Sequence, residues 1–108
     1  MLDYSLFNDL DIRIGTIISA NKFPEARNPS YKLKINFGKY GILKSSAQIT
    51  KLYKPEDLIN KQVLALVNLG SRKIANYESE RLILGAVDKE KVFLLKPEDK
   101  ALNGESVL

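Results

Sequence analysis

The sequence predicts an all-β protein, and three observations support this prediction. Apolar and polar residues alternate with period two in several short segments, which is typical of half-buried strands. Only one segment, which begins at Pro55, has the start expected of a helix. The 108 residues, 44% of them hydrophobic, suffice for one core, so we expect a single domain over residues 1–108.

Three strands are expected in the N-terminal half. Residues 10–19 alternate in such a way that Arg13 and the other odd-numbered residues would face outward. A loop with two prolines, residues 23–30, separates this strand from residues 31–37, whose odd-numbered side chains would point inward. Residues 38–41 form a tight connection to a third strand at 42–49, with its even-numbered side chains outward.

A short helix and further strands follow. Pro55 suits a first helical position, and the acidic Glu56 and Asp57 suit the first turn. Residues 63–67 are apolar on both faces, which predicts that an added segment or a second subunit covers the outer one. After a loop at 70–79, we expect a strand at 82–87 and a last apolar run at 92–95.

Three strands, a helix and two more strands are the order of an OB-fold. This fold is a five-stranded Greek-key barrel, here with a short helix between strands 3 and 4 and a C-terminal extension. Other small barrels remain compatible with the same strand order.

The composition excludes most enzymes. The chain has no Cys, His or Trp, and therefore no disulfide, no thiolate nucleophile and no Ser-His-Asp triad. The usual Cys and His ligands of zinc are missing too, so we expect no metal, no cofactor and no catalytic activity. The first ten residues lack a signal-peptide pattern and no apolar run is long enough to cross a bilayer, which predicts a cytoplasmic protein with no membrane insertion.

Positive charge is concentrated in the middle of the chain. Residues 22–54 contain eight Lys and Arg and one acidic residue, or 8 − 1 = +7, while the whole chain carries +4 and the remainder therefore −3. Such a segment is either a solvated lysine-rich surface or a binding surface for a polyanion such as nucleic acid. The two interpretations differ in whether the charges share one face.

Several motifs in a fixed order resemble a known family. Residues 11–17 (DIRIGTI), 55–63 and 68–80 are similar to the tRNA-binding domain appended to some methionyl- and phenylalanyl-tRNA synthetases. Residues 23–27, 31–33 and above all 45–50 (SSAQIT) are similar to the CsaA-type stand-alone members. The resemblance implies an OB-fold, tRNA as a partner and a homodimer. CsaA-type members are described as secretion-related chaperones, which implies unfolded or exported polypeptides as alternative partners.

Two segments depart from the synthetase-type pattern. Residues 23–27 read Phe-Pro-Glu-Ala-Arg where those members have His-Pro-x-Ala-Asp. Residues 79–82 read Ser-Glu-Arg-Leu where they have Ser-x-Gly-Met.

Candidate tRNA-binding residues come from the strands and loops that OB-folds use for oligonucleotides. Cations would attract phosphates, and hydroxyl and amide groups would bond sugars or base edges. The candidates are Arg13, Arg27, Lys32, Lys34, Lys44, Ser46, Gln48, Asn68, Arg72, Lys73 and Ser79.

Each candidate also has a purely structural interpretation. The strand lysines could simply prevent edge-to-edge aggregation, and Arg13 could pair with Asp11 or a helix carboxylate. Asn68 and Ser79 could satisfy backbone groups in loops.

Tyr40 and Tyr77 could stack on bases at loop tips. For a polypeptide partner, the candidate residues of an apolar groove are Phe23, Tyr40 and Ile74.

Overall fold

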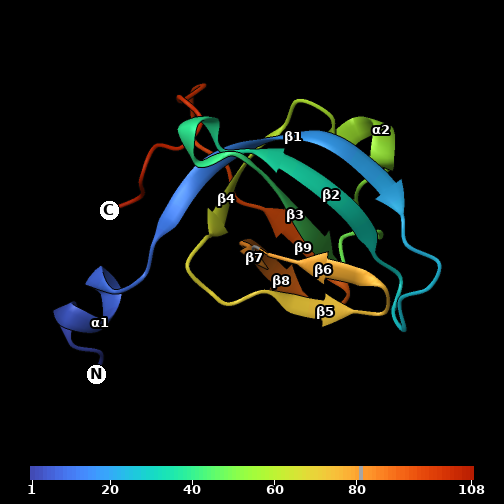
Figure 1. Cartoon of the computed structure of the whole chain (residues 1–108), viewed down its shortest axis with the longest axis horizontal. Helices are drawn as coiled ribbons and strands as arrows, with labels where there is room; N and C mark the ends of the chain where they lie inside the picture. Colours follow the sequence, from blue (N-terminus) through green and yellow to red (C-terminus); the bar gives the residue numbers. More distant parts are fainter. Residues whose placement is uncertain (81) are drawn as a thin grey trace.

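A computed structural model of the chain describes residues 1–80 and 82–108. Nearly all of its regular structure is antiparallel β-sheet (Figure 1). The elements are α1 (Tyr4–Asn8), β1 (Ile12–Lys22), β2 (Tyr31–Asn36), a 3-10 turn (Gly38–Tyr40), β3 (Ile42–Ala47), α2 (Pro55–Leu58), β4 (Gln62–Leu66), β5 (Arg72–Ile74), β6 (Tyr77–Ser79), β7 (Leu82–Ile83), β8 (Gly85–Asp88) and β9 (Lys91–Leu94).

Five strands form the main sheet in the order β3-β2-β1-β4-β7. The outer strands β3 and β7 also contact each other, so the sheet curls into a nearly closed barrel. The helix α2 lies between β3 and β4 in the chain, where the OB-fold prediction placed it. The all-β prediction and the OB-type barrel are confirmed.

The core lies inside this barrel and follows the predicted alternation in β2. Leu33, Ile35 and Phe37 have no exposed area, and the residues between them are partly or fully exposed. Leu58 of α2 and Val63 of β4 close the same core and are equally buried. Burying such side chains contributes about 1.5–3 kcal/mol each, so this cluster supplies the main driving force for folding.

The predicted faces of the first strand are correct only in part, since Ile14 is buried as expected but residues of the opposite face are buried too. The odd-numbered Gly15 and Ile17 face the core: Ile17 has no exposed area, and a Cβ on Gly15 would lie 2.6 Å from the side chain of Ile35. The register with β2 shifts between Ile17 and Ser19, and Ile18 is 40% exposed. Such a bulge reverses the alternation within one strand, and a period-two pattern cannot reveal it.

The segment after β4 also differs from the prediction. Residues 70–79, expected to be a loop, contain the hairpin β5–β6. The expected strand at 82–87 is divided into β7, which pairs with β4, and β8, which pairs with β9. The break falls at Leu84, whose N–H donates to the carbonyl of Leu64. Residues 92–94 therefore belong to the hairpin β8–β9, and Leu95 connects it to the main sheet by accepting from the Leu64 N–H of β4.

Both ends of the chain have structure that the sequence pattern did not indicate. The helix α1 begins after Asp3, whose carboxylate accepts from the Ser5 N–H, and none of its residues is buried. It lies to one side of the barrel in Figure 1. Near the C-terminus, residues 104–107 run along β1 and exchange backbone hydrogen bonds with Ile12 and Ile14. No helix in the described part of the chain has the length and apolar character needed to span a membrane.

Candidate nucleic-acid interface

Three lysines share the outer face of β2 and β3. The register between these strands places Lys34 opposite Lys44, and Lys32 opposite Ser46. Lys34 is exposed, while Lys32 and Lys44 are half-buried. Like charges directly opposite each other destabilise an antiparallel pair. A bound polyanion would offset this repulsion. Selection for stability alone would not place two lysines opposite each other.

Two aromatic rings lie under these lysines. Phe23 and Tyr77 pack edge to face, with their ring centroids 5.6 Å apart. The Lys32 ammonium lies 5.4 Å from the Phe23 centroid and 5.6 Å from that of Tyr77. The Lys44 ammonium lies 5.2 Å from the Tyr77 centroid. Both distances to Tyr77 fall within the range of cation–π attraction, so one ring holds two cations close together.

Tyr77 is held in place by its own hydroxyl. The hydroxyl donates to the backbone carbonyl of Leu33 over 2.9 Å, which fixes the ring against β2. Burial raises the pKa of Tyr77, and the nearby carboxylate of Glu80 raises it further. The phenol therefore stays protonated at neutral pH and keeps its role as donor.

The β5–β6 hairpin is attached to the edge of β3. The Ser46 N–H donates to Ser79 Oγ over 3.0 Å, and the Glu80 N–H donates to the Lys44 carbonyl over 2.8 Å. The Lys44 N–H in turn donates to Glu80 Oε1 over 3.3 Å. Ser79, only 8% exposed, thus satisfies a backbone donor, in line with its structural interpretation. Through these bonds the hairpin positions Tyr77 beneath the lysines.

Arg13 lies apart from the lysines. Its guanidinium forms an ion pair with Asp11 at 2.9 Å, donates to the Gly104 carbonyl over 2.8 Å and stacks 4.1 Å from the ring centroid of Tyr40. Arg13 is therefore half-buried among these three partners and does not join the lysines. The predicted pairing with Asp11 is confirmed.

Asn68 is likewise engaged in the scaffold. Its amide nitrogen donates to the Asp9 carbonyl over 2.7 Å, and its amide oxygen accepts from the Asp11 N–H over 3.0 Å. Both ends of the side chain are therefore used to hold the start of β1 against the loop after β4.

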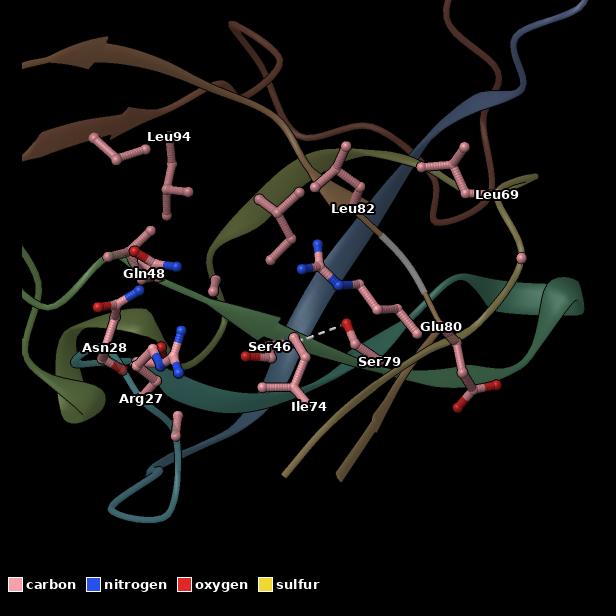
Figure 2. Close-up of a pocket in the computed structure, with 18 residues that line it drawn as sticks. Arg27, Asn28, Ser46, Gln48, Leu69, Ile74, Ser79, Glu80, Leu82 and Leu94 are labelled. Atoms are coloured by element: carbon pink, nitrogen blue, oxygen red, sulfur yellow. Dashed lines mark hydrogen bonds between the residues drawn. The ribbon is translucent and has the colours of Figure 1, made fainter. Parts of the chain in front are cut away.

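A cavity of about 760 Å³ lies between the loop before β2, the strand β3 and the segment after β4 (Figure 2). Its lining includes Ser46, which lies opposite Lys32. Its polar lining includes five of the predicted residues. These are Arg27, Ser46, Gln48, Arg72 and Ser79. Arg27, Gln48 and Arg72 are exposed and form its rim, whereas Ile49 and Leu94 line its less exposed interior. Lys73 is exposed on β5 and does not line the cavity.

The three residues predicted for an apolar peptide groove do not come together. Phe23 is 3% exposed and packs against Tyr77. Tyr40 follows the far end of β2 and is covered on one side by Arg13. Ile74 alone of the three lines the cavity. Phe23 precedes β2 and Tyr40 follows it, so the length of this strand separates the two residues.

Two residues of the site were missed by sequence reasoning. Asn28 lines the cavity, and Glu80 both lines it and bonds the backbone of Lys44. Asn28 precedes a proline in the loop before β2, which is a sign of a turn and not of a binding residue. Glu80 is acidic, and an acidic side chain is not expected among residues that bind phosphates. Within the described residues, no group of acidic side chains is placed to hold a metal ion.

The chain is similar to proteins of known family. Residues 12–106 match the family model described as "Putative tRNA binding domain". Solved structures of the chaperone CsaA from Bacillus anthracis and from Picrophilus torridus are each 45% identical to it, with TM-scores of 0.96 and 0.94. Both alignments cover 100% of this chain, with 99% of the Bacillus anthracis chain and 100% of the Picrophilus torridus chain.

Curated relatives are much longer proteins. The methionine–tRNA ligase of Pyrococcus horikoshii is 37% identical over 109 residues, which cover 98% of this chain and 15% of the ligase. The aligned segment is about one seventh of the ligase, so the chain spans only a small part of that protein's length. The match to the family model, the CsaA structures and the synthetase segment agree with the motifs in residues 11–17 and 45–50. The chain therefore belongs to the tRNA-binding domain family and resembles its CsaA-type members.

Proposed function

We propose that the protein is a non-catalytic tRNA-binding protein that binds through the outer face of β2 and β3. The single observation that carries this proposal is the row of Lys32, Lys34 and Lys44, in which two lysines lie directly opposite each other. A phosphate backbone along this face would neutralise the repulsion between them. A tRNA-binding role also fits the cytoplasmic location that the sequence predicts.

Binding of this kind recognises shape and backbone more than sequence. Lysine ammonium groups contact phosphates as point charges and carry no base information. Double-stranded RNA is recognised mostly through such contacts and through its geometry. We therefore expect similar affinity for different tRNAs, together with strong salt dependence. About six neutralised phosphates give a log–log slope of roughly −4 to −5.

Charge reversal of the three lysines tests the proposal. The variant K32E/K34E/K44E should lose tRNA binding in a gel-shift assay, because repulsion replaces attraction at the centre of the face. Its matched control is K89E/K96E/K100E, which changes the net charge equally at exposed lysines outside this face. Equal loss of tRNA binding in both variants would show that net charge alone, and not the position of the lysines, determines the affinity. Unchanged affinity in the first variant would refute the assignment of this face.

We propose further that the protein acts as a homodimer. The segment before β1 exposes a run of apolar side chains. Their exposed fractions are 83% for Leu2, 85% for Tyr4, 52% for Leu6, 42% for Phe7 and 45% for Leu10. A patch of this kind marks an interaction surface. A second copy of the chain would bury it and would place two basic faces in one particle, which increases avidity for a large RNA.

Binding of unfolded or exported polypeptides is a second candidate function. The observation that favours it is the apolar interior of the cavity, with Ile74 among its lining residues. The similar solved structures are also described as chaperone CsaA. Suppression of client aggregation, measured with and without competing tRNA, separates the two functions. Suppression that tRNA leaves unaffected, in a protein that does not bind tRNA, would favour the chaperone function.

A further inference from the structure

We propose that the cavity beside the lysine row accepts one unpaired base of the bound RNA. This inference rests on the proposed function and adds a second, chemically different contact to it. The lysine row serves phosphates, whereas the cavity has an apolar interior and a polar rim (Figure 2). A nucleobase has the same division, with two apolar faces and a polar edge.

Ser46 connects the two parts of the site. It lines the cavity, it lies opposite Lys32 on β2, and it is two residues from Lys44 on the same face of β3. A phosphate held between these lysines therefore lies beside the mouth of the cavity. An unpaired nucleotide attached to that phosphate can turn its base inward without leaving the basic face.

The lining suits a base in size and chemistry. A volume of about 760 Å³ lies within the usual range of small-ligand pockets. The interior offers Ile49, Ile83 and Leu94 as apolar surfaces against which a base can pack. Asn28 and Gln48, both exposed at the rim, each carry an amide with a donor and an acceptor. An amide can pair with the Watson–Crick edge of an unpaired base.

The charges at the rim favour RNA over a polypeptide as the occupant. Arg27 and Arg72 are exposed at the rim and attract phosphates. The acidic residue of the described lining, Glu80, accepts from the backbone N–H of Lys44 and lies toward β3. An apolar peptide segment would gain nothing from the two arginines, whereas a nucleotide uses the rim and the interior together.

Three RNAs that differ only at one end test the inference. The first is a blunt duplex, the second carries a short single-stranded 3′ overhang, and the third carries the same overhang without bases. The native protein should bind the overhang duplex about tenfold more tightly than the other two, because burying about 55 Å² of apolar base surface at about 25 cal/mol per Å² corresponds to a tenfold change in affinity. Equal affinity for the overhangs with and without bases would overturn the inference.

Two variants locate the contact in the cavity. Asn28→Ala and Gln48→Ala each remove an exposed amide at the rim with little risk to folding. Both should abolish the preference for the overhang, measured as the ratio of the affinities for the overhang duplex and the blunt duplex. The control Asn8→Ala removes an exposed amide in α1, outside both the lining and the lysine row, and should change nothing. Weaker binding to all three RNAs alike would overturn the inference.

The outcomes also separate this inference from the proposed function. If the cavity variants abolish binding of an apolar peptide but keep the preference for the overhang, the cavity is a peptide site and the inference is wrong. If K32E/K34E/K44E weakens binding while the native protein binds all three RNAs equally, the proposed function is supported and the inference of a base pocket is wrong. Failure of the native protein to bind any of the three RNAs would refute both.

Discussion

At the scale of single residues, Tyr77 determines how the lysine row is built. One ring lies close to two ammonium groups, and its hydroxyl is bonded to the backbone of Leu33. Without the ring, Lys32 and Lys44 would move apart to reduce their repulsion. We therefore propose that Tyr77 positions the lysines for phosphate binding, whereas the sequence suggested that it stacks directly on a base.

Two substitutions at Tyr77 separate the ring from the hydroxyl. Tyr77→Phe keeps the ring, so it should retain tRNA affinity while losing about 1 kcal/mol of unfolding free energy with the hydrogen bond. Tyr77→Leu removes the ring and should weaken tRNA binding several-fold, because a cation–π contact contributes about 0.5–1 kcal/mol at an exposed site. Urea melts and gel shifts measure the two effects. Equal affinity of both variants would show that the ring does not position the lysines.

Gly15 is the residue at which the barrel tolerates no side chain. A Cβ there would lie 2.6 Å from Ile35 Cγ2 and 2.7 Å from Phe37 Cε1, and both of these side chains are fully buried. Gly15→Ala should therefore cost about 1–3 kcal/mol of unfolding free energy through overpacking.

Gly70→Ala is the control for this substitution, since nothing lies within 4 Å of its added Cβ. Urea unfolding of the two variants tests the prediction. A Gly15→Ala protein as stable as the Gly70→Ala protein would show that the core relaxes around the added methyl group.

At the scale of elements, the C-terminal segment completes the sheet where β1 and β2 diverge. The β1–β2 pairing begins at Thr16, and before this residue β1 pairs with β4 on its other side. The backbone of residues 104–107 takes the vacant edge: Ile14 donates to Glu105, Gly104 donates to Ile14, and Val107 donates to Ile12. The segment thus satisfies backbone groups of a buried strand, which would otherwise be costly to leave unpaired.

Removal of residues 101–108 should consequently destabilise the barrel. Loss of the three backbone hydrogen bonds at about 1 kcal/mol each predicts a decrease of at least about 3 kcal/mol in unfolding free energy. The side-chain hydrogen bonds that join Arg13, Thr16 and Gln62 to residues 101–104 are lost as well. Removal of Leu108 alone, which is fully exposed, is the control and should leave stability unchanged. Thermal melts of both truncated proteins measure the difference. An unchanged midpoint in the longer deletion would show that water satisfies these groups equally well.

At the scale of the whole molecule, the proposed dimer depends on the apolar segment before β1. Analytical ultracentrifugation at micromolar concentration should show a dimer, because the exposed side chains of α1 have no partner in one copy of the described chain. The variant L6E/F7E should be a monomer, since it places two charges in the interface.

Two exposed residues elsewhere provide the control for this variant. Val87→Glu and Leu102→Glu alter side chains that are 72% and 76% exposed and should leave the dimer intact. A native monomer, or a dimer that survives L6E/F7E, would contradict the proposal.

The sequence by itself determined most of the architecture. The alternation in residues 31–37 predicted the buried face of β2, and Pro55 with its acidic neighbours predicted α2. These features depend on neighbours within one strand or one turn, so a local pattern contains them. The concentration of positive charge in residues 22–54 likewise indicated the strands on which the lysines lie.

Only the tertiary structure decided which candidates share a site. Asp11, Gly104 and Tyr40 engage the side chain of Arg13, and the hairpin β5–β6 placed Tyr77 beneath lysines more than thirty residues earlier in the chain. The cavity likewise joins the loop before β2 to β3, to β9 and to the segment after β4. Periodicity reports the environment along a single strand, whereas contacts between distant segments depend on how the strands close into a barrel. The sequence therefore indicated a basic binding surface, and the closure of the barrel determined that a cavity adjoins it.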